Sequence, residues 1–174
     1  MSAPTQSAII VPISDVEATV ASHRAKYDRA AGWGVPAHVT VLYPFMPPSQ
    51  INAQALDALT SAVGAVPRFG VSFDATNWFG NDVLYLAPSP AGPFVALTNA
   101  ITTAFPEYQP YGGAYDEVTP HLTVGHDAPR GALIGVEADL LRHLPIRSDI
   151  HTVALWCGSD EPASWQHMGA FDLG

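Results

Sequence analysis

Residues 36–43 read PAHVTVLY, and residues 119–125 repeat the pattern as TPHLTVG. Each run has His-x-Thr at its centre, with aliphatic residues between and after the two polar ones. Alternation with a period of two is typical of a strand that buries one face. We therefore expect each histidine to share a face of its strand with the threonine two residues later.

The elements around these runs occur twice in the same order. The hydrophobic periodicity and the turn residues predict strands at 7–13, 37–43 and 68–76 and helices at 15–31 and from Ser49 through Val63. The same order then follows, with strands at 83–87, 120–125 and 150–157, helices at 93–105 and 130–143, and a closing strand at 166–173. Gly80-Asn81-Asp82 indicates a hairpin turn between the two halves.

This order predicts an α+β fold made of duplicated β-α-β-α-β units. One domain, 1–174, would contain two lobes of roughly 7–76 and 83–157, since no Gly- or Ser-rich linker separates them. If a pseudo-twofold axis relates the halves, the polar faces of the two repeated strands meet.

Two histidines and two threonines then line one site: His38, Thr40, His121 and Thr123. One neutral imidazole can accept a proton from an attacking oxygen while the other, protonated, donates to a leaving oxygen. Threonine hydroxyls can donate to the remaining oxygens of a phosphate. This set of side chains favours phosphodiester chemistry.

The runs HVTVLYPF (38–45) and TPHLTVGH (119–126) resemble those of the two-histidine (2H) phosphoesterase superfamily, in its bacterial 2′-5′ RNA ligase-like branch. The resemblance extends to FPEY at 105–108 and to the closing SWQHMGAFDLG. It implies a bilobal fold whose sheets face a central groove, and catalysis without a metal or other cofactor. It also implies a cyclic phosphodiesterase, commonly acting on 2′,3′-cyclic or 2′-5′ phosphodiesters and able to run in reverse as a ligase.

The chain departs from that family at His126, where many relatives have arginine. His126 would lie about 16 Å along a strand from His121, on the opposite face unless a bulge intervenes. We treat it as a candidate substrate-binding residue. Trp33 and Tyr115, in the loops that lead into the two repeated strands, are candidates for stacking on a base.

The chain has 7 Lys and Arg against 16 Asp and Glu, a formal charge of −9. So few cations argue against binding long nucleic acids, and favour a small nucleotide or a short RNA end. The apolar runs are too short for a membrane span, and the one cysteine excludes an internal disulfide. We expect a cytoplasmic monomer without a metal site.

Several other residues have ordinary structural interpretations. Arg24, Lys26 and Arg29 fit a solvated helix face better than an anion site. We expect Trp78, Phe79 and Trp156 to be packing residues.

Two alternatives to the enzyme remain open at this stage. A catalytically silent module could hold a nucleotide or an RNA end in the same place. The same site could also serve a phosphodiester that is not a nucleotide, or another metabolite.

Overall fold

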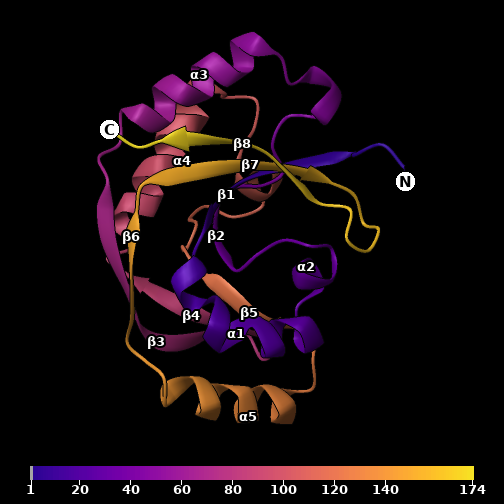
Figure 1. Cartoon of the computed structure of the whole chain (residues 1–174), viewed down its shortest axis with the longest axis vertical. Helices are drawn as coiled ribbons and strands as arrows, with labels where there is room; N and C mark the ends of the chain where they lie inside the picture. The colour runs from indigo at the N-terminus through magenta and orange to yellow at the C-terminus, as the bar shows by residue number, and fades with distance from the viewer. Residues whose placement is uncertain (1) are drawn as a thin grey trace.

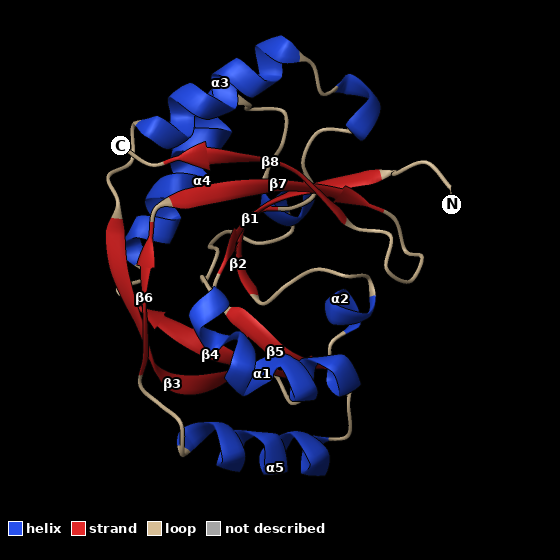
Figure 2. Cartoon of the chain, in the orientation of Figure 1, coloured by secondary structure: helices blue, strands red, loops and turns tan. Residues whose placement is uncertain are grey.

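The computed structural model describes residues 2–174 and contains two four-stranded antiparallel sheets (Figures 1 and 2). The first sheet has the order β2-β1-β7-β8, with bounds β1 (Gln6–Pro12), β2 (His38–Leu42), β7 (Thr152–Gly158) and β8 (Gln166–Asp172). The second has the order β5-β4-β3-β6, with bounds β3 (Phe69–Phe79), β4 (Val83–Ser89), β5 (Leu122–His126) and β6 (Ile146–Ile150). The expected α+β class is confirmed.

Helices cover one side of each sheet, which leaves the other side for a site. Five α-helices are present in residues 2–174: α1 (Ser14–Tyr27), α2 (Arg29–Gly32), α3 (Ala53–Gly64), α4 (Gly92–Ala104) and α5 (Arg130–Leu141). α3 and α4 pack together on β8 and β2 of the first sheet, while α1 and α5 pack on β5, β6 and β3 of the second (Figure 1). Short 3₁₀ turns, η1 (Pro48–Gln50) and η2 (Pro110–Gly113), lie in the long loops.

The two sheets correspond strand by strand, in agreement with the expected duplication. β2, β1 and β7 of the first sheet match β5, β4 and β3 of the second. In the chain α1 follows β1 and α4 follows β4, which are the second strands of the two sheet orders. The two stretches 7–76 and 83–157 exchange their last strands, because β3 joins the second sheet and β7 joins the first. Each sheet therefore draws strands from both stretches.

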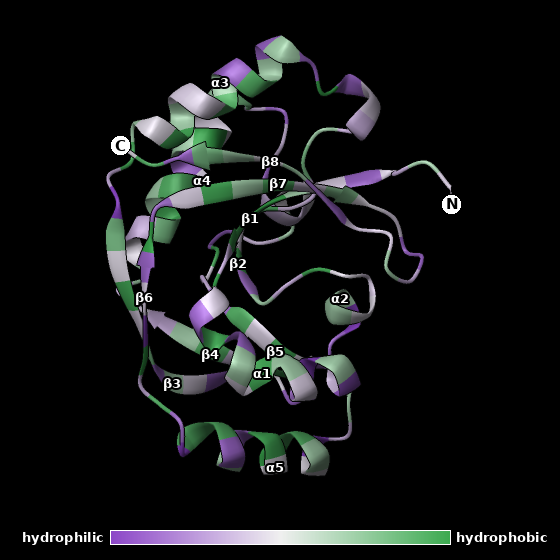
Figure 3. Cartoon of the chain, in the orientation of Figure 1, coloured by the Kyte–Doolittle hydropathy of each residue, from purple (hydrophilic) through white to green (hydrophobic). Residues whose placement is uncertain are grey.

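Burial follows the alternation read in the sequence. Val39 and Val41 of β2 and Leu122 and Val124 of β5 are at most 1% exposed, and they belong to the cluster formed with the covering helices. Fully burying each such aliphatic side chain contributes about 1.5–3 kcal/mol to folding. In Figure 3 β1 and β7 are mostly hydrophobic, whereas α3 alternates hydrophobic and hydrophilic residues, as a helix with one solvent face does.

The first helix ends earlier than the predicted residue 31. Asp28 is extended (φ −121°, ψ 114°), and its side chain accepts a hydrogen bond from Ala30 N at 3.1 Å, which caps the separate helix α2. A side chain that can cap competes with the continuation of a helix. The break turns the residues after Tyr27 toward β2.

Two helix caps and one strand also differ from the predictions. Neither Ser14 nor Asp15 caps α1, because Asp15 instead accepts a hydrogen bond from Ser148 on β6 at 2.6 Å. Asn52 rather than Ser49 caps α3, accepting from Ala55 N at 3.0 Å. The strand β6 went unpredicted, since IRSDI has little apolar character and is stabilised by pairing with β3.

Candidate active site

The two His-x-Thr segments lie on outer strands of their sheets, and these strands contact each other. β2 and β5 each occupy the first place in their sheet's order and lie side by side. On each strand the aliphatic residues point to the helices, so the polar residues face the side that the helices leave open. Four side chains share this half-buried position: His38, Thr40, His121 and Thr123.

A β-bulge follows the threonine in both strands. The register with β1 shifts after Thr40, and the register with β4 shifts after Thr123. Each bulge places two consecutive buried residues on the helix side, Val41-Leu42 in β2 and Val124-Gly125 in β5. In the first bulge the Val41 carbonyl accepts a hydrogen bond from the buried Thr98 hydroxyl of α4 at 2.7 Å.

The bulges decide where the next residue of each strand points. An ideal Cβ on Gly125 would lie 2.4 Å from Leu133 Cδ2 of α5, so this position faces the helix layer. His126 therefore emerges on the same side of the sheet as His121, because the bulge reverses the alternation. Tyr43 has the equivalent place after the first bulge. We expected His126 to face away from His121 unless a bulge intervened, and this bulge is present.

The same backbone contact orients both imidazoles. His38 Nδ1 lies 2.7 Å from Pro36 O, and His121 Nδ1 lies 2.8 Å from Thr119 O. Because a carbonyl oxygen can only accept, Nδ1 carries the proton in both rings. The neutral tautomer then leaves each Nε2 as an acceptor. In residues 2–174 neither threonine hydroxyl has a protein hydrogen-bond partner, so both can donate to a ligand.

The surroundings favour the neutral form of both histidines. The pKa of His38 is lowered from 6.5 to about 4, mainly by burial; the hydrogen bond to the Pro36 carbonyl opposes the shift, and the nearby Arg24 and His121 add to it. Burial also lowers the pKa of His121, with a smaller contribution from His126, against the opposing hydrogen bond to Thr119. Neutral imidazole is the form that can act as a base.

A buried ion pair supports the backbone before His38. Arg24 is 2% exposed; its Nε donates to Asp28 Oδ2 at 2.9 Å and its Nη2 donates to Val35 O at 3.1 Å. Glu17 accepts a hydrogen bond from Ala37 N at 2.9 Å. The expectation of a solvated helix face is therefore wrong for Arg24, because the break at Asp28 folds β2's entry loop over it.

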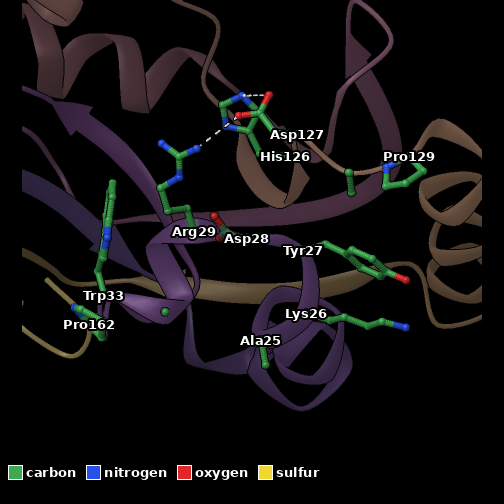
Figure 4. A pocket seen from close by; sticks show the side chains of 12 residues that line it. Ala25, Lys26, Tyr27, Asp28, Arg29, Trp33, His126, Asp127, Pro129 and Pro162 are labelled. Atoms are coloured by element: carbon green, nitrogen blue, oxygen red, sulfur yellow. Dashed lines mark ion pairs between the residues drawn. The ribbon is translucent and has the colours of Figure 1, made fainter. Parts of the chain in front are cut away.

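A cavity of about 640 Å³ lies between α2 and the end of β5 (Figure 4). Trp33 and Arg29 rise from α2 and its following loop, and His126 and Asp127 face them from the end of β5. Asp127 forms a loose ion pair with Arg29 at 3.7 Å and lies 3.4 Å from His126 Nε2. None of the four candidate catalytic side chains lines this cavity, whereas His126, five residues after His121, does.

Two of the three candidate substrate-binding residues thus come together and the third does not. Trp33 and His126 both line the cavity, whereas Tyr115 is outside it. Tyr115 is 67% exposed and packs on Tyr111 with ring centroids 5.7 Å apart. Lys26 and Arg29, expected on a solvated helix face, are exposed and also line this cavity, a role that the sequence did not indicate.

Within residues 2–174 no three His, Cys, Asp or Glu side chains gather in a metal-binding arrangement. None of the helices there has the length and the hydropathy that crossing a bilayer requires.

Comparison with known proteins completes this description. The family model of the 2′-5′ RNA ligase superfamily matches residues 11–161. In its fold the chain is similar to Escherichia coli LigT in apo form (TM-score 0.64, 18% identity, 99% of each chain covered) and to LigT complexed with 3′-AMP (0.60, 16%, 99% of each). It is also similar to TT0787 of Thermus thermophilus (0.65, 17%, 96% of this chain and 97% of that one). No curated protein sequence matches it significantly.

Proposed function

The chain belongs to the 2′-5′ RNA ligase superfamily, and from this we propose that it is a metal-independent phosphodiesterase for small cyclic or 2′-5′-linked nucleotides. The observation that carries the proposal is the pair of equivalent imidazoles on adjoining strands, each with Nδ1 bound to a backbone carbonyl. Fixing Nδ1 in this way directs the reactive Nε2 of both rings to the side of the sheets that carries the threonines.

The surroundings of the two histidines differ, which supports a different role for each of them, one as base and one as acid. His38, with a pKa of about 4, is neutral at neutral pH and suits the base. His121 is the acid in this scheme, because a bound phosphate anion raises the pKa of a nearby imidazole and stabilises its proton. The two roles exchange when the reaction runs in reverse.

Hydrolysis of a 2′,3′-cyclic phosphate then takes one displacement at phosphorus. His38 Nε2 accepts a proton from water as the water oxygen bonds to phosphorus. The bond from phosphorus to one ribose oxygen breaks, and that oxygen receives the proton from His121 Nε2. The hydroxyls of Thr40 and Thr123 donate to the non-bridging oxygens, where negative charge develops. The product is a nucleoside monophosphate.

Reversing the hydrolysis of a 2′-5′ phosphodiester joins a ribose hydroxyl to a phosphate monoester and releases water, which is 2′-5′ ligation. The same four side chains serve it, since each catalytic proton transfer is reversible. In water the hydrolytic direction is favoured, so we propose hydrolysis as the activity.

The neighbouring cavity supports a nucleotide-sized substrate. Lys26 and Arg29, two of the chain's seven Lys and Arg residues, line it in a protein whose formal charge is −9. Arg29 offers a positive charge to a phosphate, and Trp33 offers a flat ring. LigT, which shares the fold, has been crystallised with 3′-AMP, ATP and NADP+. We propose that Trp33 and His126 contact the part of the substrate beyond the reacting phosphate, and that Tyr115 adds a contact from its loop.

The test is turnover of the four nucleoside 2′,3′-cyclic phosphates in excess EDTA. We expect wild-type turnover to persist, and His38→Ala and His121→Ala each to reduce kcat by about 10²–10⁴-fold, the usual contribution of one acid–base group. His151→Ala is the matched control, because His151 is exposed on the loop between β6 and β7.

Loss of wild-type activity in EDTA would contradict the metal-free mechanism. Full activity of either site variant would contradict the acid–base roles. Tight binding of these ligands without turnover would favour a silent binding module, and neither binding nor turnover would favour a substrate that is not a nucleotide.

A further inference from the structure

The two histidines are equivalent in the fold but have different neighbours. His121 packs edge-on against Phe79, with ring centroids 4.8 Å apart and planes at 87°, and against Tyr85 at 5.4 Å and 60°. Phe79 and Tyr85 stack on each other at 4.4 Å and 29°. The rings of Phe79 on β3, Tyr85 on β4 and His121, the residue just before β5, therefore form one group.

The corresponding position beside His38 is aliphatic. On β1 the residues paired with His38 and Thr40 are Pro12 and Ile10, whereas on β4 the residue paired with Thr123 is Tyr85. In residues 2–174 no aromatic ring packs against His38. Trp156 on β7, which pairs with Ala8 as Phe79 pairs with Val83, packs on His167 with ring centroids 5.8 Å apart. Among the described residues, direct packing of an aromatic ring on a candidate catalytic imidazole therefore occurs only at His121.

Phe79 is the exposed member of the aromatic group. Its exposure is 37%, against 4% for Tyr85, so Tyr85 lies beneath it as a buried support. Phe79 ends β3 and pairs with Val83 across the tight turn of the hairpin. It packs on Tyr85 as expected, but packing accounts for only part of its surface, because more than a third stays open next to a candidate catalytic imidazole.

An open aromatic ring held on a strand pair is suited to stacking. Aromatic pairs prefer offset stacking at centroid distances such as that between Phe79 and Tyr85, and a planar ligand can extend this arrangement on the free face. Nucleobases stack on aromatic side chains with little dependence on the base, since every base has a π-face. A rigid support lowers the entropy lost when the ligand is ordered.

We propose that Phe79, supported by Tyr85, is the platform on which the base of the substrate stacks, so that the attached ribose phosphate reaches His121 and Thr123. This deepens the proposed function and rests on it. The platform predicts a preference for substrates with an aromatic base over base-free sugar phosphates. It also places the base on the second sheet, beside His121 and not beside His38.

The test compares two substrates in wild type, Phe79→Ala and Phe79→Trp. The substrates are adenosine 2′,3′-cyclic phosphate and the base-free analogue methyl riboside 2′,3′-cyclic phosphate. For the adenosine substrate we expect Phe79→Ala to raise KM by about 5- to 150-fold with a smaller change in kcat, as the loss of one base–aromatic stack implies. Phe79→Trp is expected to retain a low KM.

The base-free substrate is the internal control. Removing Phe79 also changes the packing around His121, which would alter the turnover of both substrates alike. An equal effect on both, or none on either, would overturn the platform. Val95→Ala serves as the matched variant, because Val95 is an exposed apolar residue on α4, with 39% exposure, remote from this group.

Failure of the proposed function can be told apart from failure of the platform. If wild type turns over neither substrate, the phosphodiesterase proposal fails, and equilibrium binding of 3′-AMP to wild type and Phe79→Ala becomes the measurement. Weaker binding by Phe79→Ala supports the platform. Equal binding by the two proteins, or no binding by either, overturns it.

Discussion

Replacing His38 by asparagine is expected to make the folded protein more resistant to acid while removing its turnover. The amide of asparagine can still donate to Pro36 O, as Nδ1 of the imidazole does over 2.7 Å. It cannot accept a proton in the pH range of interest. The substitution therefore removes the titration of His38 and keeps the contact that orients the backbone.

The magnitude follows from the pKa of His38, which is about 4 in the folded protein against an ordinary value of 6.5. Between these values the unfolded chain binds a proton at this site and the folded protein does not, so the wild type loses stability as pH falls from 6.5 toward 4. Linkage gives a loss of about 2.5 kcal/mol at pH 4.5 and almost none at pH 7.5. The asparagine variant does not lose this stability, because its side chain at position 38 binds no proton in this pH range.

Urea unfolding followed by tryptophan fluorescence measures the effect, since the chain has four tryptophans. The quantity to compare is the free energy of unfolding of His38→Asn minus that of wild type, at pH 7.5 and pH 4.5. Any packing defect from the smaller side chain affects both values, so it cancels in the change with pH. We expect this difference to become more favourable to the variant by about 2.5 kcal/mol at the lower pH.

His151→Asn is the control, because His151 is exposed. Its difference from wild type is expected to change little between the two pH values. The same free-energy difference for His38→Asn at pH 7.5 and pH 4.5 would refute the reasoning, since it would mean that His38 titrates in the folded protein as it does in the unfolded chain.

Two other predictions concern the pH profile and the bulge. The pKa values of His38 and His121 are both lowered, so kcat/KM is expected to peak below pH 6.5 in a bell-shaped profile, falling on the alkaline side as His121 loses its proton; a maximum at pH 8 would contradict the assigned roles. Gly125→Ala would bring a Cβ within 2.4 Å of Leu133 Cδ2, and overpacking of this kind costs about 1–3 kcal/mol of stability. Gly135→Ala on α5 is its control, because a Cβ there meets nothing within 4 Å and replacing a helical glycine adds about 0.5–1 kcal/mol. Equal unfolding free energies for the two alanine variants would show that the bulge tolerates a side chain.

The sequence alone determined the elements whose signal is local. Alternation in HVTVL and HLTV predicted which side chains of each strand face the helices, because side chains alternate along any extended backbone. The Gly80-Asn81-Asp82 run predicted the hairpin of β3 and β4, because these residue types favour tight turns between paired strands. The resemblance to a family, carried by the two His-x-Thr runs, also came from residues adjacent in the chain.

Tertiary structure decided what depends on residues far apart in the chain. IRSDI becomes β6 through pairing with β3, and Arg24 is buried with a hydrogen bond to the Val35 carbonyl, eleven residues away. The local hydrophobic periodicity predicts neither of them. The bulge that turns His126 toward His121 is defined only by the register with β4. The grouping of Phe79 with His121 likewise requires three paired strands. A strand's own sequence sets which residues alternate, whereas the register with its neighbours sets where the alternation shifts and which side chains meet.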